Sequence, residues 1–235
     1  MRKFSLTLLA TLAAAVSHAA TVNWGASIDT GIIDSSNLAV TQGNLVRIGY
    51  FGSLTNAQVT ANAQTQTGLS LLNADFKLFA QATLGEGTDL DASFSKSSSP
   101  PYSSLPGFLP ASQIYFWATK SSNTSTAANA LASVTQTAIA YVPVASNSSW
   151  MFPATDVSPA PLIDISSLSN PNAVFLAGSY KSVSSAALND IFDTPNSALK
   201  LANVENVAPI PEPSTLAFGV LAAWVAAGSR RRYRK

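Results

Sequence analysis

The chain has 235 residues, with 13 Lys and Arg, 12 Asp and Glu, no cysteine and one histidine, His18. Without cysteine the fold gains nothing from disulfides and must rest on its hydrophobic core. The absence of cysteine, and of histidine after His18, excludes Ser-His-Asp and Cys-His mechanisms as well as the usual zinc, haem and iron–sulfur sites. We therefore expect no metal, no cofactor and no enzymatic activity.

The N-terminus has the layout of a secretory signal peptide. Arg2 and Lys3 precede the apolar stretch 4–16, and small residues follow it up to Ala19 and Ala20. This pattern predicts a signal peptide over residues 1–19, cut by signal peptidase after Ala19 or Ala20. The alternative is an uncleaved membrane helix, for which the apolar run is short.

Six short runs rich in β-branched, aromatic and apolar residues follow, separated by clusters of Gly, Pro, Asn and Ser. They cover residues 22–28, 44–51, 75–84, 113–119, 137–144 and 173–180. This spacing predicts an all-β fold, an antiparallel β-sandwich ectodomain over residues 20–208 that forms a single domain.

Two of these runs indicate how the strands face the core. In the 75–84 run, Phe76 and Leu78 share one face and Asp75 and Lys77 the other, which predicts one buried and one wet face. The segment from Ile114 to Trp117 is apolar on both faces, as in a central strand or a ligand-facing one.

Three segments fit strands less well. Residues 127–140 are alanine-rich and compatible with a helix, although their second half favours a strand. Residues 184–192 have apolar residues at helical spacing after a Ser cap and predict a short helix. Residues 95–112 are dominated by Ser and Pro and predict a long exposed loop.

Few catalytic or metal-binding patterns remain to be weighed. Asp29-Thr30-Gly31 matches the aspartic protease tripeptide, but it occurs once and is ordinary turn chemistry after a strand. Two Ser-x-x-Lys matches lack the partner motifs of penicillin-binding enzymes. Glu86, Asp89 and Asp91 could offer oxygens to Ca²⁺, but they lack the spacing of a calcium loop and favour a solvated turn.

Aromatic residues give the one ligand hypothesis for the ectodomain. Trp24, Tyr115, Trp117 and Trp150 are candidates for a flat platform on which sugar rings stack. The competing interpretation places them in the core, because strands that are apolar on both faces are usual in sandwiches.

The C-terminal tail, residues 209–235, has three parts. Pro211-Glu212-Pro213-Ser214 should be extended and accessible. Residues 216–229 are fourteen residues without a charge, which as a short transmembrane helix would rise ~21 Å against a ~30 Å hydrocarbon core. The basic end, residues 230–235, should stop transfer and remain in the cytoplasm. Its cations are Arg230, Arg231, Arg232, Arg234 and Lys235.

The order of these three parts resembles the PEP-CTERM sorting signal of Gram-negative bacteria, over residues 209–235. The resemblance implies recognition and processing by the membrane enzyme exosortase, and export in an organism that makes extracellular polysaccharide. A simple unprocessed C-terminal anchor is the alternative.

Charge separates the ectodomain from its two ends. Six Lys and Arg face eleven Asp and Glu between residues 20 and 208, which argues against a nucleic-acid partner. We expect an exported protein, anchored at first in the inner membrane and then at the cell surface or in the extracellular matrix. Its expected function is structural or adhesive, with extracellular polysaccharide as a partner. The alternatives are a carbohydrate-binding module and, least favoured, an extracellular hydrolase.

Overall fold

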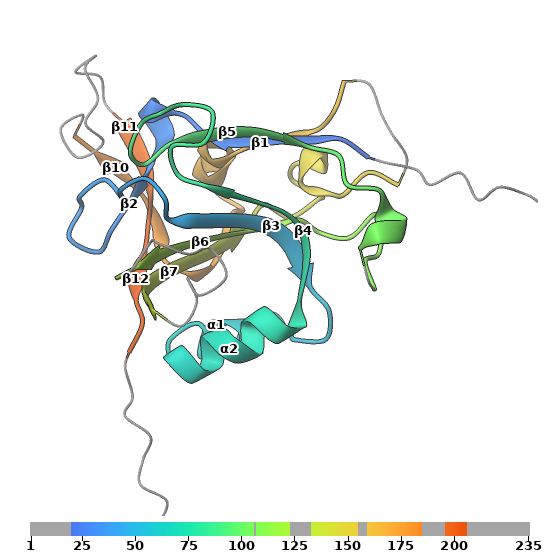
Figure 1. Cartoon of the computed structure of the whole chain (residues 1–235), viewed down its shortest axis with the longest axis horizontal. Coiled ribbons are helices and arrows are strands. Elements are labelled where there is room, and N and C mark those ends of the chain that lie inside the picture. The colour runs from blue at the N-terminus through green and yellow to red at the C-terminus, as the bar shows by residue number, and fades with distance from the viewer. Residues whose placement is uncertain (1–19, 106, 123–132, 155–158, 185–195, 206–235) are drawn as a thin grey trace, which may run out of the picture. The chain divides into compact units, whose positions relative to one another are not determined.

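A computed structural model of the chain describes residues 20–105, 107–122, 133–154, 159–184 and 196–205 (Figure 1). These residues up to Val204 form one unit, and Glu205 belongs to a second unit that extends to Lys235. The predicted signal peptide, residues 1–19, and the predicted sorting tail, residues 209–235, lie outside the described residues.

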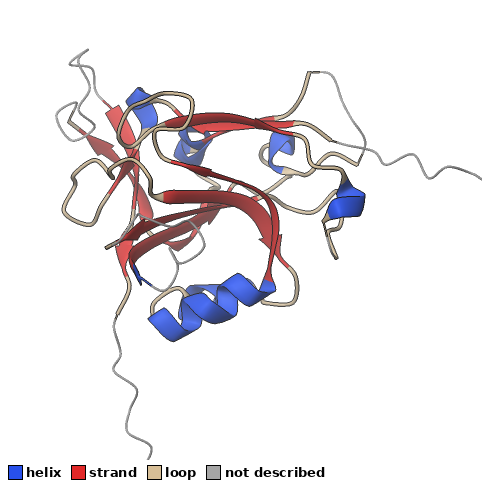
Figure 2. Ribbon diagram, viewed as in Figure 1, coloured by secondary structure: helices blue, strands red, loops and turns tan. Residues whose placement is uncertain are grey.

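The described unit consists mainly of short strands, with two α-helices between the third and fourth strand (Figure 2). The strands are β1 (Val22–Ala26), β2 (Ile32–Ile33), β3 (Leu45–Phe51), β4 (Phe76–Thr83), β5 (Phe94–Ser98), β6 (Tyr115–Ser121), β7 (Val134–Tyr141), β8 (Leu162–Asp164), β9 (Val174–Ala177), β10 (Ser179–Val183), β11 (Asn196–Lys200) and β12 (Ala202–Asn203). The helices are α1 (Asn56–Asn62) and α2 (Gln66–Asp75), and short 3₁₀ turns lie at Ile28–Thr30, Tyr102–Ser104, Ser148–Trp150 and Ile165–Ser169.

The strands form one large and two small sheets. The six-stranded sheet has the order β12-β7-β6-β3-β4, with β9 also paired to β7. The small sheets are β5-β1-β8 and β10-β11-β2. Most neighbours are antiparallel, but β8 runs parallel to β1 and β2 runs parallel to β11. The fold is therefore predominantly β and sandwich-like, as the sequence predicts, with two parallel pairs that the sequence does not reveal.

One face of the six-stranded sheet packs against the two small sheets. Trp24 of β1 and Phe94 of β5 meet Phe116 of β6 there, and the Trp24 and Phe94 ring centroids lie 4.9 Å apart. All three side chains are no more than 1% exposed. This first core cluster joins the layers that Figure 1 shows above and below each other, β1 and β5 over β3, β6 and β7.

The opposite face of the six-stranded sheet is covered by α1 and α2. Val59 of α1 and Leu69 and Leu72 of α2 are fully buried against Trp117 of β6 and Phe76 of β4. Both faces of the sheet are therefore largely buried at its centre, along β3 and β6. This explains why the segment that forms β6 is apolar on both faces, as predicted.

The two helices were not predicted, although their N-termini carry recognisable caps. Thr55 accepts a hydrogen bond from the Gln58 backbone, and the Gln58 side chain bonds back to the Thr55 backbone, which is a capping box. Thr65 caps α2 by accepting from the Gly68 backbone. These caps start two short helices with few apolar positions: Val59 is the buried side chain of α1, and Leu69 and Leu72 are those of α2.

All six predicted strands are present, with shifted ends. Asp75 is the last residue of α2, and the register of β3 against β4 shifts between Ile48 and Gly49. Phe76 and Phe79 are three residues apart and lie on opposite faces, so Phe76 faces the helices and Phe79 the first core cluster. The bulge turns Phe79 to the same face as Ala82. The prediction of one buried and one wet face for β4 is therefore wrong. The last predicted strand is split into β9 and β10 at Gly178, which has φ +78°.

The predicted loop over residues 95–112 is only partly a loop. Its first residues belong to β5, whose serines at positions 95 and 97 face solvent. Phe108 is 8% exposed, and the Tyr102 hydroxyl donates to the Pro153 carbonyl, so the rest of the segment is anchored to the core. Of the alanine-rich run 127–140, the second half is strand β7 as favoured. The predicted helix over 184–192 lies outside the described residues except for Ser184.

Arg47 of β3 is an exception on the helix-covered face. It is 9% exposed, its Nη1 donates to Asn73 Oδ1 of α2 at 2.7 Å, and its guanidinium lies 5.4 Å from the Trp117 ring centroid. Nε has no hydrogen-bond partner among the described residues. Burial lowers the Arg47 pKa to about 10, so the side chain still carries its charge at neutral pH. The sheet thus holds a cation without a carboxylate partner in the described part of the chain.

We predict that Arg47→Met leaves the free energy of unfolding unchanged within about 1 kcal/mol or raises it. Methionine can fill much of the same space without a desolvated charge and an unsatisfied N–H. Arg47→Ala also leaves a cavity and should cost about 2–4 kcal/mol. Urea unfolding of both variants measures the difference. Equal losses in the two variants would show that the ring contact and the Asn73 bond outweigh desolvation.

Candidate functional site

A groove runs across the outer face of the β5-β1-β8 sheet and encloses about 350 Å³. The sheet register places Ser97, Asn23 and Leu162 in one row across the three strands. The neighbouring row contains Ser95, Gly25 and Asp164. The volume lies within the range of ligand clefts, roughly 300–1,000 Å³.

The polar groups of the two rows are available to a ligand. Ser95 and Ser97 are exposed and Asn23 is half-buried, and in the described part of the chain their side chains have no hydrogen-bond partner. Asp164 uses Oδ1 to cap the following 3₁₀ turn, accepting from Ser166 N at 2.7 Å. Its Oδ2 has no such partner among the described residues, so the groove offers hydroxyl, amide and carboxylate groups side by side.

Gly25 keeps the middle of the groove open, because it has no side chain. A Cβ at this position would lie 2.8 Å from the Phe94 carbonyl oxygen, which is backbone and cannot swing away. Leu162 adds an apolar wall, because its side chain is 57% exposed. The floor is thus bare backbone between polar side chains and one aliphatic side chain.

The groove carries little free charge. Lys96 lies at its edge, but its Nζ is 2.7 Å from Glu86 Oε1, in a pair whose side chains are 30% and 40% exposed. Asp164 is then the one charged lining residue without an ion-pair partner in the described part of the chain. The arrangement can bind a hydroxyl-rich ligand by hydrogen bonds and has no second carboxylate in its lining for acid–base work.

The predicted stacking platform is wrong. Trp24, Trp117 and Trp150 are no more than 1% exposed, and Trp117 lies in a different core cluster from the other two. The indole N–H of Trp24 donates a hydrogen bond to Ser98 Oγ, and that of Trp117 donates to Thr137 Oγ1. Large flat side chains gain most by leaving water, so the strands that carry them turn them inward.

Tyr115 is the one partly exposed member of the predicted set, and it has a neighbour that sequence reasoning missed. Its ring centroid lies 4.8 Å from that of Tyr141 at the end of β7. Asn56 joins both hydroxyls, accepting from Tyr115 at 3.1 Å and donating to Tyr141 at 2.9 Å. Burial, with a smaller contribution from Tyr141, raises the Tyr115 pKa. The cluster ties α1 to the sheet.

The remaining acidic candidates are dispersed. Asp29 is exposed in the 3₁₀ turn after β1, where the turn interpretation placed it. Glu86 pairs with Lys96, Asp91 accepts from Gln42 N at 3.0 Å, and Asp89 offers its backbone carbonyl to the Gln42 side chain. Within the described ranges, no three His, Cys, Asp or Glu side chains are placed to hold a metal ion.

The predicted sorting and cleavage residues belong to the two ends of the chain. Pro211, Glu212, Pro213 and Ser214 lie outside the described residues, as do the basic residues 230–235 and Ala19. Ala20 is fully buried, two residues before the start of β1. Among the described helices none is long and apolar enough to cross a membrane.

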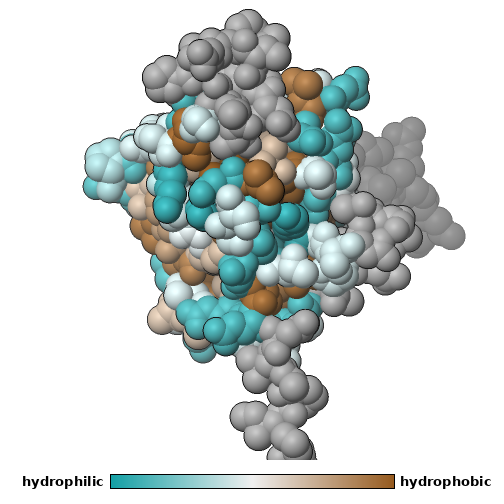
Figure 3. Space-filling model, turned by 90° about the vertical axis from the view of Figure 1, so that its left-hand side faces the viewer, coloured by the Kyte–Doolittle hydropathy of each residue, from teal (hydrophilic) through white to brown (hydrophobic). Residues whose placement is uncertain are grey.

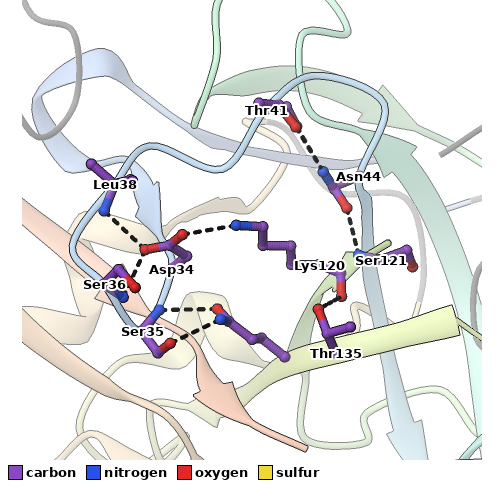
Figure 4. A network of polar contacts seen from close by, with 10 residues as sticks. Asp34, Ser35, Ser36, Leu38, Thr41, Asn44, Lys120, Ser121 and Thr135 are labelled. Atoms are coloured by element: carbon purple, nitrogen blue, oxygen red, sulfur yellow. Dashed lines mark hydrogen bonds and ion pairs between the residues drawn. The ribbon is translucent and has the colours of Figure 1, made fainter. Parts of the chain in front are cut away.

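A second polar cluster fastens the 34–44 loop to β6 and β7 (Figure 4). Lys120 Nζ lies 2.8 Å from Asp34 Oδ2, while Asp34 Oδ1 accepts from the Ser36 and Leu38 backbones at 2.8 and 2.9 Å. The Asp34 side chain is only 5% exposed. Its burial opposes ionisation, but the bonds from Lys120, Leu38 and Ser36 outweigh this and lower its pKa. We interpret the cluster as a structural clamp, because its groups satisfy one another.

Comparisons with protein families, with curated proteins and with solved structures found no match to this chain.

We predict that Trp117→Ala destabilises the fold by about 3–5 kcal/mol, because it empties the centre of the second core cluster. Thermal and urea unfolding measure this loss. Ser97→Ala in the groove is the control and should change stability by less than about 0.5 kcal/mol. A Trp117→Ala variant as stable as the parent would contradict the placement of Trp117 in the core.

We predict that Asp34→Asn lowers the free energy of unfolding by about 1–3 kcal/mol at pH 7, because asparagine keeps the loop bonds but leaves Lys120 unpaired. The Asp34 pKa is lowered on folding, so this stabilisation is present above its ordinary value of 3.8 and disappears as pH falls through the folded value. The gap between parent and variant should therefore be constant above about pH 5 and shrink below pH 4.

The more exposed Glu86–Lys96 pair supplies the matched control for this measurement. Glu86→Gln should cost at most about 1 kcal/mol at neutral pH. If Asp34→Asn and Glu86→Gln lowered the free energy of unfolding by the same amount, the burial of Asp34 would not strengthen its ion pair. A parent-to-variant gap for Asp34→Asn that grew on acidification would contradict the assigned sign.

Proposed function

We propose that this chain is an exported protein, sorted by its C-terminal tail to the cell surface or extracellular matrix. Its function there is structural or adhesive, in association with extracellular polysaccharide. The observation that carries the proposal is the order of Pro211–Ser214, an uncharged stretch and a basic end at the close of the sequence. The proposal requires signal peptidase and exosortase as processing enzymes. The chain is anchored in the inner membrane only until it is processed.

The described unit suits an exported protein in its chemistry. It builds two core clusters on a central sheet and uses no cysteine, so its folding does not depend on the redox state of the compartment. Its surface agrees with solvent contact on the side seen in Figure 3, where hydrophilic residues dominate and hydrophobic ones are scattered among them. These features are compatible with export.

A carbohydrate-binding module is the second candidate function. The groove on the β5-β1-β8 sheet favours it, because its free hydroxyl, amide and carboxylate groups match the hydrogen-bonding needs of sugars. An extracellular hydrolase is the least favoured function, since the residues that line the groove include a single carboxylate.

We predict that the region between the two apolar ends lies outside the inner membrane, because basic residues flank both ends on the cytoplasmic side. A reporter fused at Ser122 should be active only outside the cytoplasm. Mass spectrometry of surface-located protein should find neither residues 1–19 nor residues 230–235. An intact Lys235 terminus in most surface molecules would refute processing and leave a simple anchor.

The matched control tests the tail itself. Glu212→Ala changes the motif while leaving the apolar stretch and the basic end in place, so it should trap unprocessed chain in the membrane fraction. Glu205→Ala, a few residues upstream, should leave processing as in the parent. Equal processing of both variants would remove the motif from the proposal.

A further inference from the structure

We propose that the groove across β5, β1 and β8 binds a single strand of a neutral, hydroxyl-rich polysaccharide. This deepens the proposed function, on which it rests for the choice of an extracellular glycan. The starting observation is the two cross-strand rows, Ser97–Asn23–Leu162 and Ser95–Gly25–Asp164, which lie on one sheet face.

The chemistry of the rows selects hydroxyl groups as partners. Ser95, Ser97 and Asn23 can each donate and accept, and Asp164 Oδ2 accepts. Sugar hydroxyls also do both, so each can be satisfied by two neighbouring groups of the groove. Residues two apart on a strand are about 7 Å apart and neighbouring strands about 4.8 Å apart, so the rows offer a repeated pattern to a polymer.

The shape of the groove selects a flat chain. Gly25 leaves bare backbone between the two serines and Asp164, so a ring can approach the sheet closely. Leu162, 57% exposed, provides an apolar surface for the C–H face of a ring. Exposed aliphatic surface of this kind gains by being covered.

Charge selects a neutral polymer over an anionic one. Lys96 at the rim is neutralised by Glu86 at 2.7 Å, and Asp164 contributes a negative charge. The whole region from 20 to 208 has eleven acidic against six basic residues. A polyanion would approach an acidic protein and meet a carboxylate, with no free cation in the groove lining to hold it.

A peptide strand fits the groove less well. Peptides that join sheets do so through backbone hydrogen bonds at an open edge. The groove floor is β1, which is paired on both sides, to β5 and to β8. Its face therefore presents side chains, and recognition must come from them.

The test measures binding of the full chain to soluble polysaccharides by affinity electrophoresis. The probes are dextran and hydroxyethylcellulose as neutral chains, alginate as a polyanion and soluble chitosan as a polycation. We expect retardation by at least one neutral chain and none by alginate. The double variant Asn23→Ala with Ser97→Ala should weaken that binding about tenfold, since it removes two hydrogen-bonding groups of one row.

Ser95→Arg provides a second variant, which fills the groove without touching the core and should abolish the retardation. Ser182→Arg is the matched control, because Ser182 is also an exposed serine on an edge strand, β10, outside the groove. It should bind as the parent does. Circular dichroism and melting of all variants separate lost binding from lost folding.

Three outcomes would overturn the inference. They are no binding of either neutral chain by the parent, unchanged binding in both groove variants, and binding of chitosan or alginate alone. Failure of the groove is distinguishable from failure of the proposed function. Groove variants that are exported and processed but bind normally would reject the groove only. A parent that binds through the groove but stays in the cytoplasm would reject the sorting proposal only.

Discussion

Burial of both faces of the six-stranded sheet is the constraint on which the rest of the structure depends. Without cysteine the chain cannot be held by disulfides, and stability must come from apolar area removed from water. The small sheets cover one face and α1 and α2 cover the other. Strand β6, paired on both sides and apolar on both faces, lies at the centre of this arrangement.

This constraint takes the largest aromatic side chains out of surface recognition. Trp24 and Trp150 belong to one core cluster and Trp117 to the other, and each is no more than 1% exposed. With these three indoles buried, the proposed ligand binding must use smaller groups of the described unit. In the described unit, the groove offers hydroxyl, amide and carboxylate groups on the outer face of the β5-β1-β8 sheet. Groups on this face do not have to be buried in the core.

The strands of the six predicted runs were predictable because their signal is local, a short run of β-branched, aromatic and apolar residues. The short strands β2, β8, β11 and β12 and the serine-rich β5 lack a run long or apolar enough to give this signal and were missed. The helices were missed because both are short: beside the caps at Thr55 and Thr65, their apolar face is limited to Val59 in α1 and Leu69 and Leu72 in α2. The bulge near Gly49, which places Phe79 on the same face as Ala82, depends on pairing between strands and leaves no mark within β4. The sequence did not decide whether the tryptophans are buried or exposed, because strand alternation does not say which face of a sheet is covered.

The groove could not have been predicted, because its residues come from three segments separated by more than sixty positions and are individually ordinary. Asn23, Ser97 and Asp164 acquire meaning only through the register of β5-β1-β8, and one pair in that sheet is parallel. The proposed sorting signal differs from the groove, because its residues are contiguous in the sequence. It can be predicted without knowledge of the fold. Because the groove lies in the first unit and the tail in the second, substitutions in one should leave the chemistry of the other intact. The proposed sorting and the proposed binding should therefore be separable, so that each can be tested without the other.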